Sequence, residues 1–412
     1  MDKIMNVAND VGYGFTKIKL ENFAVKVPSV IAALQPQNIN APVTFDNTTD
    51  RDRYFADFLN HLDVSISSSE VASSQRYLVG QAAVDSQLPL TSFDVSDFGG
   101  KSEDDLSLIL TLSLIAGKRV QAAYLDQEDL NVPLHVTVNM ATALPVSEGK
   151  RKGVKDAYIN RYKGRKHTVT FHNFRDPITV TLDFKEVYVG LEGEVALFYL
   201  RYAPKKMREA LYKQLKTNYP ALAEQVTPDQ LVAVPEVMGI DIGEGSTDIN
   251  IVTNGKANAD VSSSLLRGYG NALTQAISVL QSRQMGFDSR AQLQDYLAQE
   301  DNPFTAANKK MVEQIVYAQL EPFADQILRE VSNVMRNGGA KVALVYVFGG
   351  GAIPMHAHSN LPAKLIDKLT HFRLKGGLDI PVIWLPDDTT QIVNELALDF
   401  ILAQLTKSSQ AS

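Results

Sequence analysis

The stretches DVGYGFTK (residues 10–17) and DIGEGSTD (residues 241–248) share one pattern: an acid, two glycines spaced two residues apart, and a threonine. Alternating apolar residues follow each copy, as expected for the outgoing strand of a hairpin. The copies lie about half a chain length apart, and each opens a β-rich region that gives way to helices. The sequence therefore predicts an α/β protein with two domains of related design.

Length and composition are those of an ordinary globular protein with two cores. The chain has 412 residues, of which 45% are hydrophobic and 21% are charged. Lys and Arg total 40 against 47 for Asp and Glu, giving a net charge of −7. An acidic total is poorly suited to a broad contact with a nucleic-acid backbone, so we expect no direct nucleic acid binding. The absence of cysteine excludes disulfides and is compatible with a reducing cytosol.

Neither end of the chain predicts membrane contact. MDKIMNVAND (residues 1–10) lacks the apolar core of a signal peptide, and no amphipathic membrane helix is predicted at either end. LSLILTLSLIAG (residues 106–117) is shorter than the ~20 residues of a membrane-spanning helix. We expect a buried helix there, capped by Ser102 with Asp105 three residues later. The predicted localisation is cytoplasmic.

The pattern of elements suggests where the domains begin and end. Residues 4–10 and 15–20 are predicted to form a hairpin, and residues 134–146 a strand that stops at Leu-Pro. The polar residues 35–74 are predicted to form a mobile surface excursion with one short amphipathic piece.

The predicted crossover between the domains falls within residues 187–235. Domain I is predicted at residues 1–190, with a C-terminal helix at residues 388–406 packing back on it. Domain II is predicted at residues 191–387.

The repeated turn has the chemistry of a phosphate loop. Glycines permit close approach of a ligand, and successive N–H groups in such a turn form an anion-binding nest. A threonine adds a hydroxyl and a lysine adds a mobile positive charge. The acid would repel a phosphate unless it holds Mg²⁺, directly or through water. Each copy thus resembles half of a phosphate–magnesium clamp, although a single copy is more often a glycine-rich hairpin without a ligand.

Three motifs in this order resemble the actin-like ATPase superfamily, which includes actin, Hsp70 and sugar kinases. DVGYGFTK is similar to its first phosphate loop, DIGEGSTD to the second, and VYVFGGGAIPM (residues 345–355) to its adenosine motif. VTVNMATALPV and QIVNELALDFIL are similar to its two connecting segments, although Glu395 replaces a usual small residue. The resemblance implies an actin/Hsp70/sugar-kinase-like fold with a nucleotide cleft between two related α/β domains.

Softer patterns narrow the resemblance to the bacterial ParM-type actins, which segregate plasmids. The similar stretches are VPSVIAAL, RYLVGQAAV, ATALPVSEGKRK and KGRKHTVTFHNFRDPITVTLDFKEVYVGLEGEVALF. This resemblance implies an ATPase whose subunits assemble head to tail into a filament. It also implies a DNA-bound adaptor protein of the ParR type as the second partner.

The family pattern also implies roles for individual residues. Asp10 and Asp241 would hold Mg²⁺ through water and would take part in catalysis together with Glu192. Glu192 would align the hydrolytic water, with Glu194 as its rival for that role. The nucleotide is expected to be ATP, with GTP possible. The implied nucleotide-binding residues are Gly12, Tyr13, Gly14, Thr16 and Lys17 in the first loop, Gly243, Gly245, Ser246 and Thr247 in the second, and Gly349, Gly350 and Gly351 beside the adenosine.

Other functions on the same fold stay open at this stage. A small-molecule kinase would need a base aimed at a substrate hydroxyl, and no distinctive segment supplies one. A chaperone ATPase would need a further substrate-binding domain, while a cell-shape or division actin is a close alternative. The basic runs KRKGVK and KGRK could bind an acidic adaptor or DNA, or could simply be solvated. The histidines of HAH (residues 356–358) are weak metal-site candidates.

Overall fold

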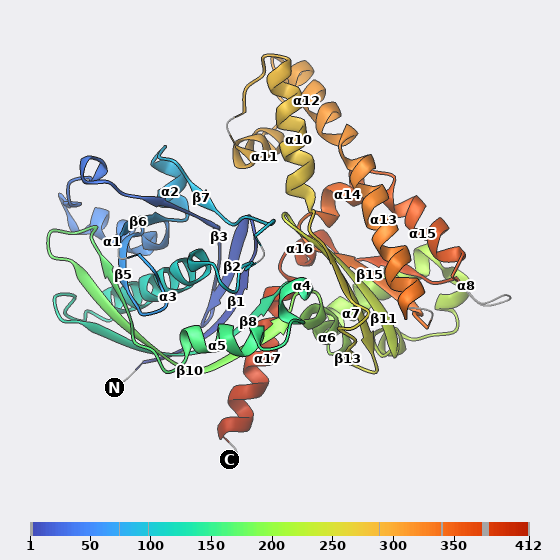
Figure 1. The fold of residues 1–412 in the computed structure, drawn as a ribbon, viewed down its shortest axis with the longest axis horizontal. Helices are drawn as coiled ribbons and strands as arrows, with labels where there is room; N and C mark the ends of the chain where they lie inside the picture. The colour runs from blue at the N-terminus through green and yellow to red at the C-terminus, as the bar shows by residue number, and fades with distance from the viewer. Residues whose placement is uncertain are drawn as a thin grey trace. The chain divides into compact units, whose positions relative to one another are not determined.

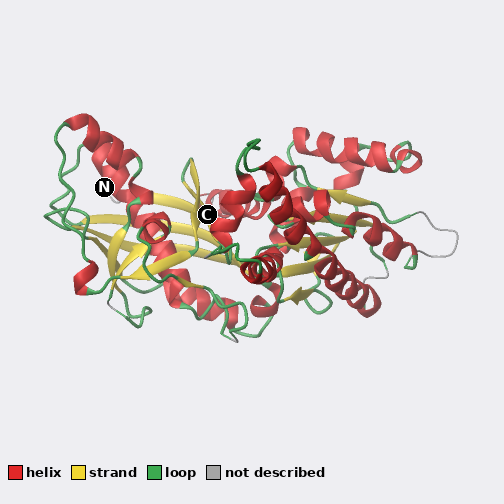
Figure 2. Cartoon of the chain, turned by 90° about the horizontal axis from the view of Figure 1, so that it is seen from above, coloured by secondary structure: helices red, strands yellow, loops and turns green. Residues whose placement is uncertain are grey.

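The computed structural model describes residues 3–73, 75–97, 99–287, 289–338, 341–372 and 379–410. The chain forms two compact units, each with helices on both sides of its strands (Figures 1 and 2). Unit 1 contains Met1–Leu144, Glu148–Leu191 and Glu395–Ser412, and unit 2 contains Pro145–Ser147 and Glu192–Asn394.

Unit 1 is built on a ten-stranded sheet with the order β3-β2-β1-β8-β10-β9-β5-β6-β4-β7. The strands are β1 (Ile4–Val11), β2 (Phe15–Leu20), β3 (Phe23–Pro28), β4 (Val30–Ala33), β5 (Asp63–Ser67), β6 (Arg76–Val79), β7 (Thr91–Ser92), β8 (Leu134–Leu144), β9 (His167–Phe171) and β10 (Ile178–Leu191). β8 is parallel to β1 and β10, whereas β1 and β2 form the predicted antiparallel hairpin. The long strand at the predicted Leu-Pro stop is also confirmed, and β3, which ends in a proline, lies at one edge of the sheet.

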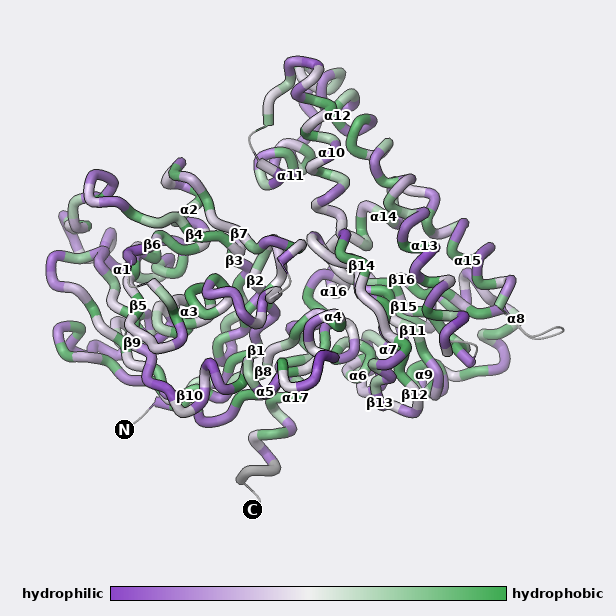
Figure 3. The backbone as a smooth tube through the Cα atoms, viewed as in Figure 1, coloured by the Kyte–Doolittle hydropathy of each residue, from purple (hydrophilic) through white to green (hydrophobic). Residues whose placement is uncertain are grey.

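The longest helix of unit 1, α3, is buried and packs mainly against the strands of the sheet. The helices of this unit are η1 (Pro36–Asn38), α1 (Thr48–Ala56), η2 (Phe58–Asn60), α2 (Gln81–Asp85), α3 (Asp105–Leu125), α4 (Val146–Gly149, which begins in unit 2), α5 (Val154–Tyr162) and most of α17 (Val393–Gln410). Hydrophobic residues are concentrated along α3 (Figure 3). Among the described residues α3 is the one helix long and apolar enough to cross a membrane, and 89% of its most apolar window is buried in the fold.

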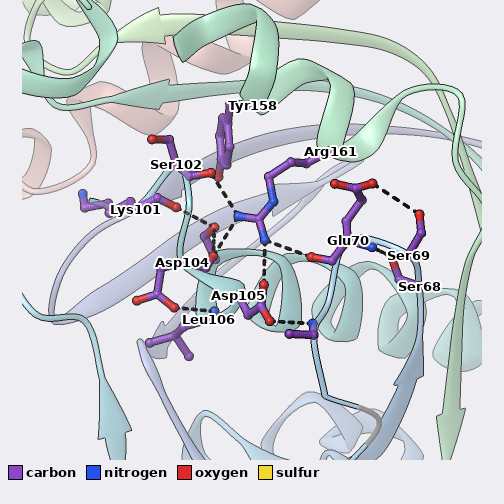
Figure 4. Close-up of polar contacts among 12 residues, drawn as sticks. Ser68, Ser69, Glu70, Lys101, Ser102, Asp104, Asp105, Leu106, Tyr158 and Arg161 are labelled. Atoms are coloured by element: carbon purple, nitrogen blue, oxygen red, sulfur yellow. Dashed lines mark hydrogen bonds and ion pairs between the residues drawn. The ribbon is translucent and has the colours of Figure 1, made fainter. Parts of the chain in front are cut away.

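The predicted N-cap of α3 is wrong by two residues. Asp104 caps the helix by accepting a hydrogen bond from the Leu106 N–H at 2.8 Å. The Ser102 N–H instead donates to a carboxylate oxygen of Glu148 at 3.0 Å. The Arg161 guanidinium, drawn in Figure 4, donates to the carbonyl oxygens of Ser102 and Asp104, so this turn is fixed by long-range contacts before the helix begins.

The predicted surface excursion at residues 35–74 is confirmed only in part. Residues 35–47 are mostly exposed and contain only the short helix η1, but residues 48–67 form α1, η2 and β5, which pairs with both β6 and β9. Phe55, Phe58 and Leu62 are buried in the core of unit 1. The sequence revealed the amphipathic piece, but only two apolar residues, Val64 and Ile66, marked the strand. So short an alternation does not predict a central strand by itself.

Unit 2 repeats the central pattern of unit 1. Its strands are β11 (Glu236–Ile242), β12 (Thr247–Thr253), β13 (Lys256–Ala257), β14 (Ser263–Leu265), β15 (Leu344–Phe348) and β16 (Val382–Trp384). The order is β13-β12-β11-β15-β16, with β14 pairing β12. An antiparallel β11–β12 hairpin is followed by the parallel neighbours β15 and β16, just as the β1–β2 hairpin is followed by β8 and β10. The prediction that both halves share one design is confirmed at this level.

The helices of unit 2 cover this smaller sheet. They are α6 (Glu194–Arg201), α7 (Lys205–Asn218), α8 (Pro220–Ala223), α9 (Pro228–Val232), α10 (Tyr269–Ser282), α11 (Arg290–Ala298), α12 (Ala306–Ala318), α13 (Leu320–Asn337), α14 (Ala352–His358), α15 (Leu361–Thr370) and α16 (Asp387–Thr390). The predicted terminal helix is in fact two helices, α16 and α17. The Thr390 carbonyl accepts a hydrogen bond from the Gly349 N–H at 3.0 Å. This contact takes the Thr390 carbonyl out of the helical hydrogen-bond pattern.

Glycines with positive φ separate neighbouring elements at two places. Gly80 (φ 63°) ends the strand β6 and starts α2 within RYLVGQAAV. Gly153 (φ 83°) separates α4 from α5. Neither conformation is readily adopted by a residue with a side chain, so the elements stop there.

We expect Phe58→Ala to destabilise unit 1 strongly, because this side chain is 0% exposed and its ring centroid lies 5.1 Å from that of Phe171. Removing a buried phenylalanine costs about 3–5 kcal/mol. The matched control is Phe304→Ala, since that side chain is 93% exposed and its removal should change the free energy of unfolding by less than about 0.5 kcal/mol. Urea unfolding of both variants measures the difference, and equal midpoints would contradict the burial of residues 48–67.

Candidate functional site

The first glycine-rich turn joins β1 to β2. Asp10 at the end of β1 lies opposite Lys17 in β2. The Gly12 N–H donates to the Phe15 carbonyl oxygen at 3.1 Å and closes the turn. A Cβ atom on Gly12 would lie 2.6 Å from that oxygen, so only glycine fits.

The polar side chains of this turn fall into two groups. The Lys17 ammonium lies 3.1 Å from Oδ2 of Asp10, which is 4% exposed. Behind the turn, the hydroxyls of Thr16 and Ser29 share a hydrogen bond of 2.9 Å, and the Gly14 carbonyl accepts from the Ser29 N–H. The Thr16 and Ser29 hydroxyls thus hold the backbone of the turn. Lys17 offers a cation for a phosphate, and Asp10 offers a carboxylate for a hydrated metal ion.

Lys101 is a residue near this turn that the sequence did not reveal. It is 2% exposed, and its ammonium donates to the Val11 carbonyl at 2.8 Å and lies 4.2 Å from the centroid of the Tyr13 ring. The Tyr13 ring also makes an edge-to-face contact with Phe93. Glu148 accepts a hydrogen bond from the Lys101 N–H at 3.2 Å. The surrounding FGGKSEDD reads as an exposed loop, and no local pattern predicts a buried lysine.

Glu395 on α17 adds a carboxyl group to this part of unit 1. Burial raises the pKa of Glu395 to about 6, and the negative charge of Asp10 acts in the same direction. Lys19 and Lys17 oppose this shift. The family pattern expects a small residue at this position, so the carboxyl group distinguishes this chain from that pattern.

The second glycine-rich turn joins β11 to β12 in the same way. Asp241 lies opposite Asp248, where the first turn has a lysine. The Gly243 N–H donates to the Ser246 carbonyl oxygen at 2.9 Å. This bond corresponds position by position to the bond that closes the first turn, so the sequence repeat is also a repeat of backbone geometry.

The triple glycine packs directly against the second turn. Gly349 has φ 96°, and a Cβ atom there would lie 2.4 Å from Oδ1 of Asp241. The Gly351 N–H donates to the Ile242 carbonyl at 2.8 Å. A Cβ atom on Gly350 would meet no heavy atom within 4 Å, which leaves open space at that residue. The sequence thus brings the predicted adenosine motif to the predicted second phosphate loop within one unit.

The hydroxyls of the second turn already donate to protein acceptors. The Ser246 hydroxyl donates to Oδ2 of Asp248 at 3.0 Å, and the Thr247 hydroxyl donates to the Arg267 carbonyl at 2.9 Å. Gly245, which directly precedes Ser246 in the turn, is also buried. A phosphate contact through either hydroxyl would therefore require an exchange of hydrogen bonds.

The two candidate catalytic glutamates differ in their surroundings. Glu192 follows the end of β10 and is 8% exposed, whereas Glu194 begins α6 and is half-buried. The N–H of the intervening Gly193 donates to Oδ1 of Asn394 at 3.2 Å. The same asparagine side chain donates to Oδ2 of Asp241 at 2.7 Å. No local sequence pattern singles out this asparagine, because the contact spans 153 residues.

Within the described residues no group of three or more His, Asp or Glu side chains is placed to hold a metal ion directly. The histidines of HAH contact aromatic rings: His356 lies against Trp384, and His358 stacks on Tyr317 at 4.0 Å. Single carboxylates such as Asp10 and Asp241 fit a Mg²⁺ ion that keeps most of its water ligands. The donor set is therefore compatible with the predicted water-mediated contact.

Comparison with protein families assigns the chain. Residues 8–194 match the family described as "Actin like proteins N terminal domain", and residues 239–359 match "Archaeal actin homologue MreB-like, C-terminal". Both families are actin homologues, and together the matches span about three quarters of the chain. The chain belongs to the actin-like proteins. Among curated proteins none is similar enough in sequence to match.

Solved structures share the fold over the whole chain. The actin-like protein Alp7A superposes with a TM-score of 0.69 at 14% identity, covering 99% of this chain and 98% of Alp7A. Bacillus thuringiensis ParM with ATP gives a TM-score of 0.59 at 15% identity, covering 98% and 100% of the two chains. A non-polymerisable quadruple mutant of pCBH ParM gives 0.58 at 15% identity with the same coverage. The expected actin-like α/β fold is thus confirmed.

We expect Glu395→Gln to stabilise the protein at alkaline pH. The folded-state pKa of about 6 lies above the ordinary value of 4.5, so ionisation is penalised in the folded state. The wild type therefore loses stability as the pH rises from about 4.5 through 6, while the glutamine variant does not. Thermal unfolding at pH 4.5 and pH 8 tests this: the variant should melt higher only at pH 8, and equal melting temperatures there would contradict the shift.

Proposed function

We propose that this chain is a nucleotide-dependent, filament-forming ATPase that segregates plasmid DNA through polymer growth and a DNA-bound adaptor. The observation that carries this proposal is the pair of glycine turns closed by equivalent backbone hydrogen bonds, Gly12 to Phe15 and Gly243 to Ser246. The likeness to ParM structures obtained with ATP, ADP and AMPPNP supports it.

In this proposal both turns serve one nucleoside triphosphate. The N–H groups of the turns and the Lys17 ammonium would bind phosphate oxygens. Asp10 and Asp241 would hold the water ligands of Mg²⁺. When bound, this ion would neutralise the phosphate charge. Gly349–Gly351 would let the adenosine lie against backbone. ATP is the proposed nucleotide, and GTP fits the same groups.

Hydrolysis would require little covalent chemistry from the protein. Phosphoryl transfer to water depends on positioning and on charge stabilisation. Glu192 is buried at the end of β10, which suits a residue that orients one water molecule. Glu194 is the alternative, and its greater exposure makes it the weaker candidate.

Nucleotide state would then control assembly. Loss of the γ-phosphate removes contacts that hold switch elements, and a head-to-tail contact that does not close into a ring generates a filament. An adaptor of the ParR type would link the filament to DNA, so the acidic chain need not bind DNA itself. The proposed location is the cytoplasm.

Right-angle light scattering after addition of Mg-ATP tests the function, with phosphate release measured in parallel. A rise that later decays as phosphate is released is the expected result. A flat trace with sugar-dependent ADP production would overturn the proposal in favour of a small-molecule kinase. Assembly that requires anionic vesicles would favour a cell-shape or division actin instead.

We expect Glu192→Ala to bind nucleotide normally and to hydrolyse it about 100-fold more slowly, the size of effect typical of a lost general base. Glu194→Ala is the matched control and should hydrolyse at the wild-type rate. Asp241→Ala should abolish hydrolysis. Steady-state phosphate release and binding of a fluorescent nucleotide measure the two quantities separately. Normal turnover in Glu192→Ala with slow turnover in Glu194→Ala would reverse the assignment.

A further inference from the structure

Both ends of one buried amide group are engaged at the second turn. Asn394 lies at the start of α17 and is 9% exposed. Its Nδ2 donates to Oδ2 of Asp241 at 2.7 Å, and its Oδ1 accepts from the Gly193 N–H at 3.2 Å. A single side chain thus connects a candidate metal-water ligand to the residue that follows the candidate catalytic glutamate.

Asparagine is the side chain that these two contacts require. A carboxylate needs a donor and a backbone N–H needs an acceptor, and an amide carries both on one planar group. The two partners also determine the orientation of the Asn394 amide, because the reversed amide would place its oxygen against the Asp241 carboxylate. Aspartate could serve only the Gly193 N–H, and alanine could serve neither partner.

The contact to Gly193 acts on the position of Glu192. The Gly193 nitrogen belongs to the peptide group that carries the Glu192 carbonyl, so its hydrogen bond fixes the plane of that peptide. Gly193 has φ 73°, and a Cβ atom there would lie 2.1 Å from Nδ2 of Asn250 and 3.5 Å from Cβ of Asp241. The backbone after Glu192 is therefore closely packed and has one defined conformation.

We propose that Asn394 is a positioning residue for hydrolysis, which holds Asp241 and the Glu192–Gly193 peptide in register with one another. This inference rests on the proposed ATPase function. Asn394 need not touch nucleotide or water, because it acts through these two partners. Displacement of the attacking group by about 1 Å can slow an enzyme about 100-fold, so loss of the amide should lower turnover far more than nucleotide affinity.

The test compares Asn394→Ala with Asn139→Ala. Asn139 has the same 9% exposure and also makes a side-chain hydrogen bond, to Oδ1 of Asn6 at 3.1 Å, but it contacts none of the candidate site residues through it. Asn394→Ala should slow single-turnover phosphate release about 10–100-fold with the Kd for a fluorescent nucleotide changed less than about threefold. Asn139→Ala should leave both quantities unchanged. Equal turnover of Asn394→Ala and wild type would overturn the inference.

A double-mutant cycle separates positioning from a general loss of structure. If Asn394 acts partly through Glu192, adding Asn394→Ala to Glu192→Ala should slow hydrolysis less than it slows the wild type, because only the Asp241 contact is left to lose. Fully additive slowing would overturn the inference. Should Asn394→Ala melt before the assay temperature, the nearly isosteric Asn394→Asp replaces it. That variant keeps the acceptor for Gly193 but loses the donor for Asp241, so it should also hydrolyse slowly.

The outcome for the wild type distinguishes the two levels of the proposal. A wild-type protein that assembles and hydrolyses ATP while Asn394→Ala does so equally well contradicts only the role of Asn394. A wild-type protein that hydrolyses no nucleoside triphosphate contradicts the proposed function, and the role of Asn394 with it.

Discussion

One backbone hydrogen bond, made twice, is the constraint on which the rest of the site depends. In each hairpin the N–H of the first glycine donates to the carbonyl three residues later, from Gly12 to Phe15 and from Gly243 to Ser246. A side chain at Gly12 would collide with that carbonyl. The turn must therefore be glycine, and once closed it fixes the acid before it and the threonine after it.

The strands and helices that follow from a local sequence pattern were predictable from the sequence. The paired hairpins, the long strand β8 and the buried helix α3 all follow from alternation, glycine spacing and apolar runs. β5 was not predictable, because its place between β6 and β9 is set by partners far away in the chain. Local propensity and periodicity carry no information about such pairings.

The same division applies to the candidate site. Asp10, Asp241 and the glycines belong to motifs that can be recognised in the sequence, although their roles stay predictions. Lys101 and Asn394 could not be recognised, because their significance lies in single contacts to Val11 and Asp241 across about 90 and 153 residues. Residues that position others have no spacing rule of their own, and only the folded backbone reveals them.

The charges at the site explain why its acids are buried before any ligand binds. Asp10 is paired with Lys17, and Asp241 accepts a hydrogen bond from Asn394, so each carboxylate is compensated within its own unit. Burial favours the protonated form of a carboxyl group, as the raised pKa of Glu395 illustrates even though Lys19 and Lys17 oppose the shift. In the proposed function each carboxylate would thus already be held in place by a partner within its own unit. Such preorganisation would lower the cost of orienting it toward a hydrated metal ion.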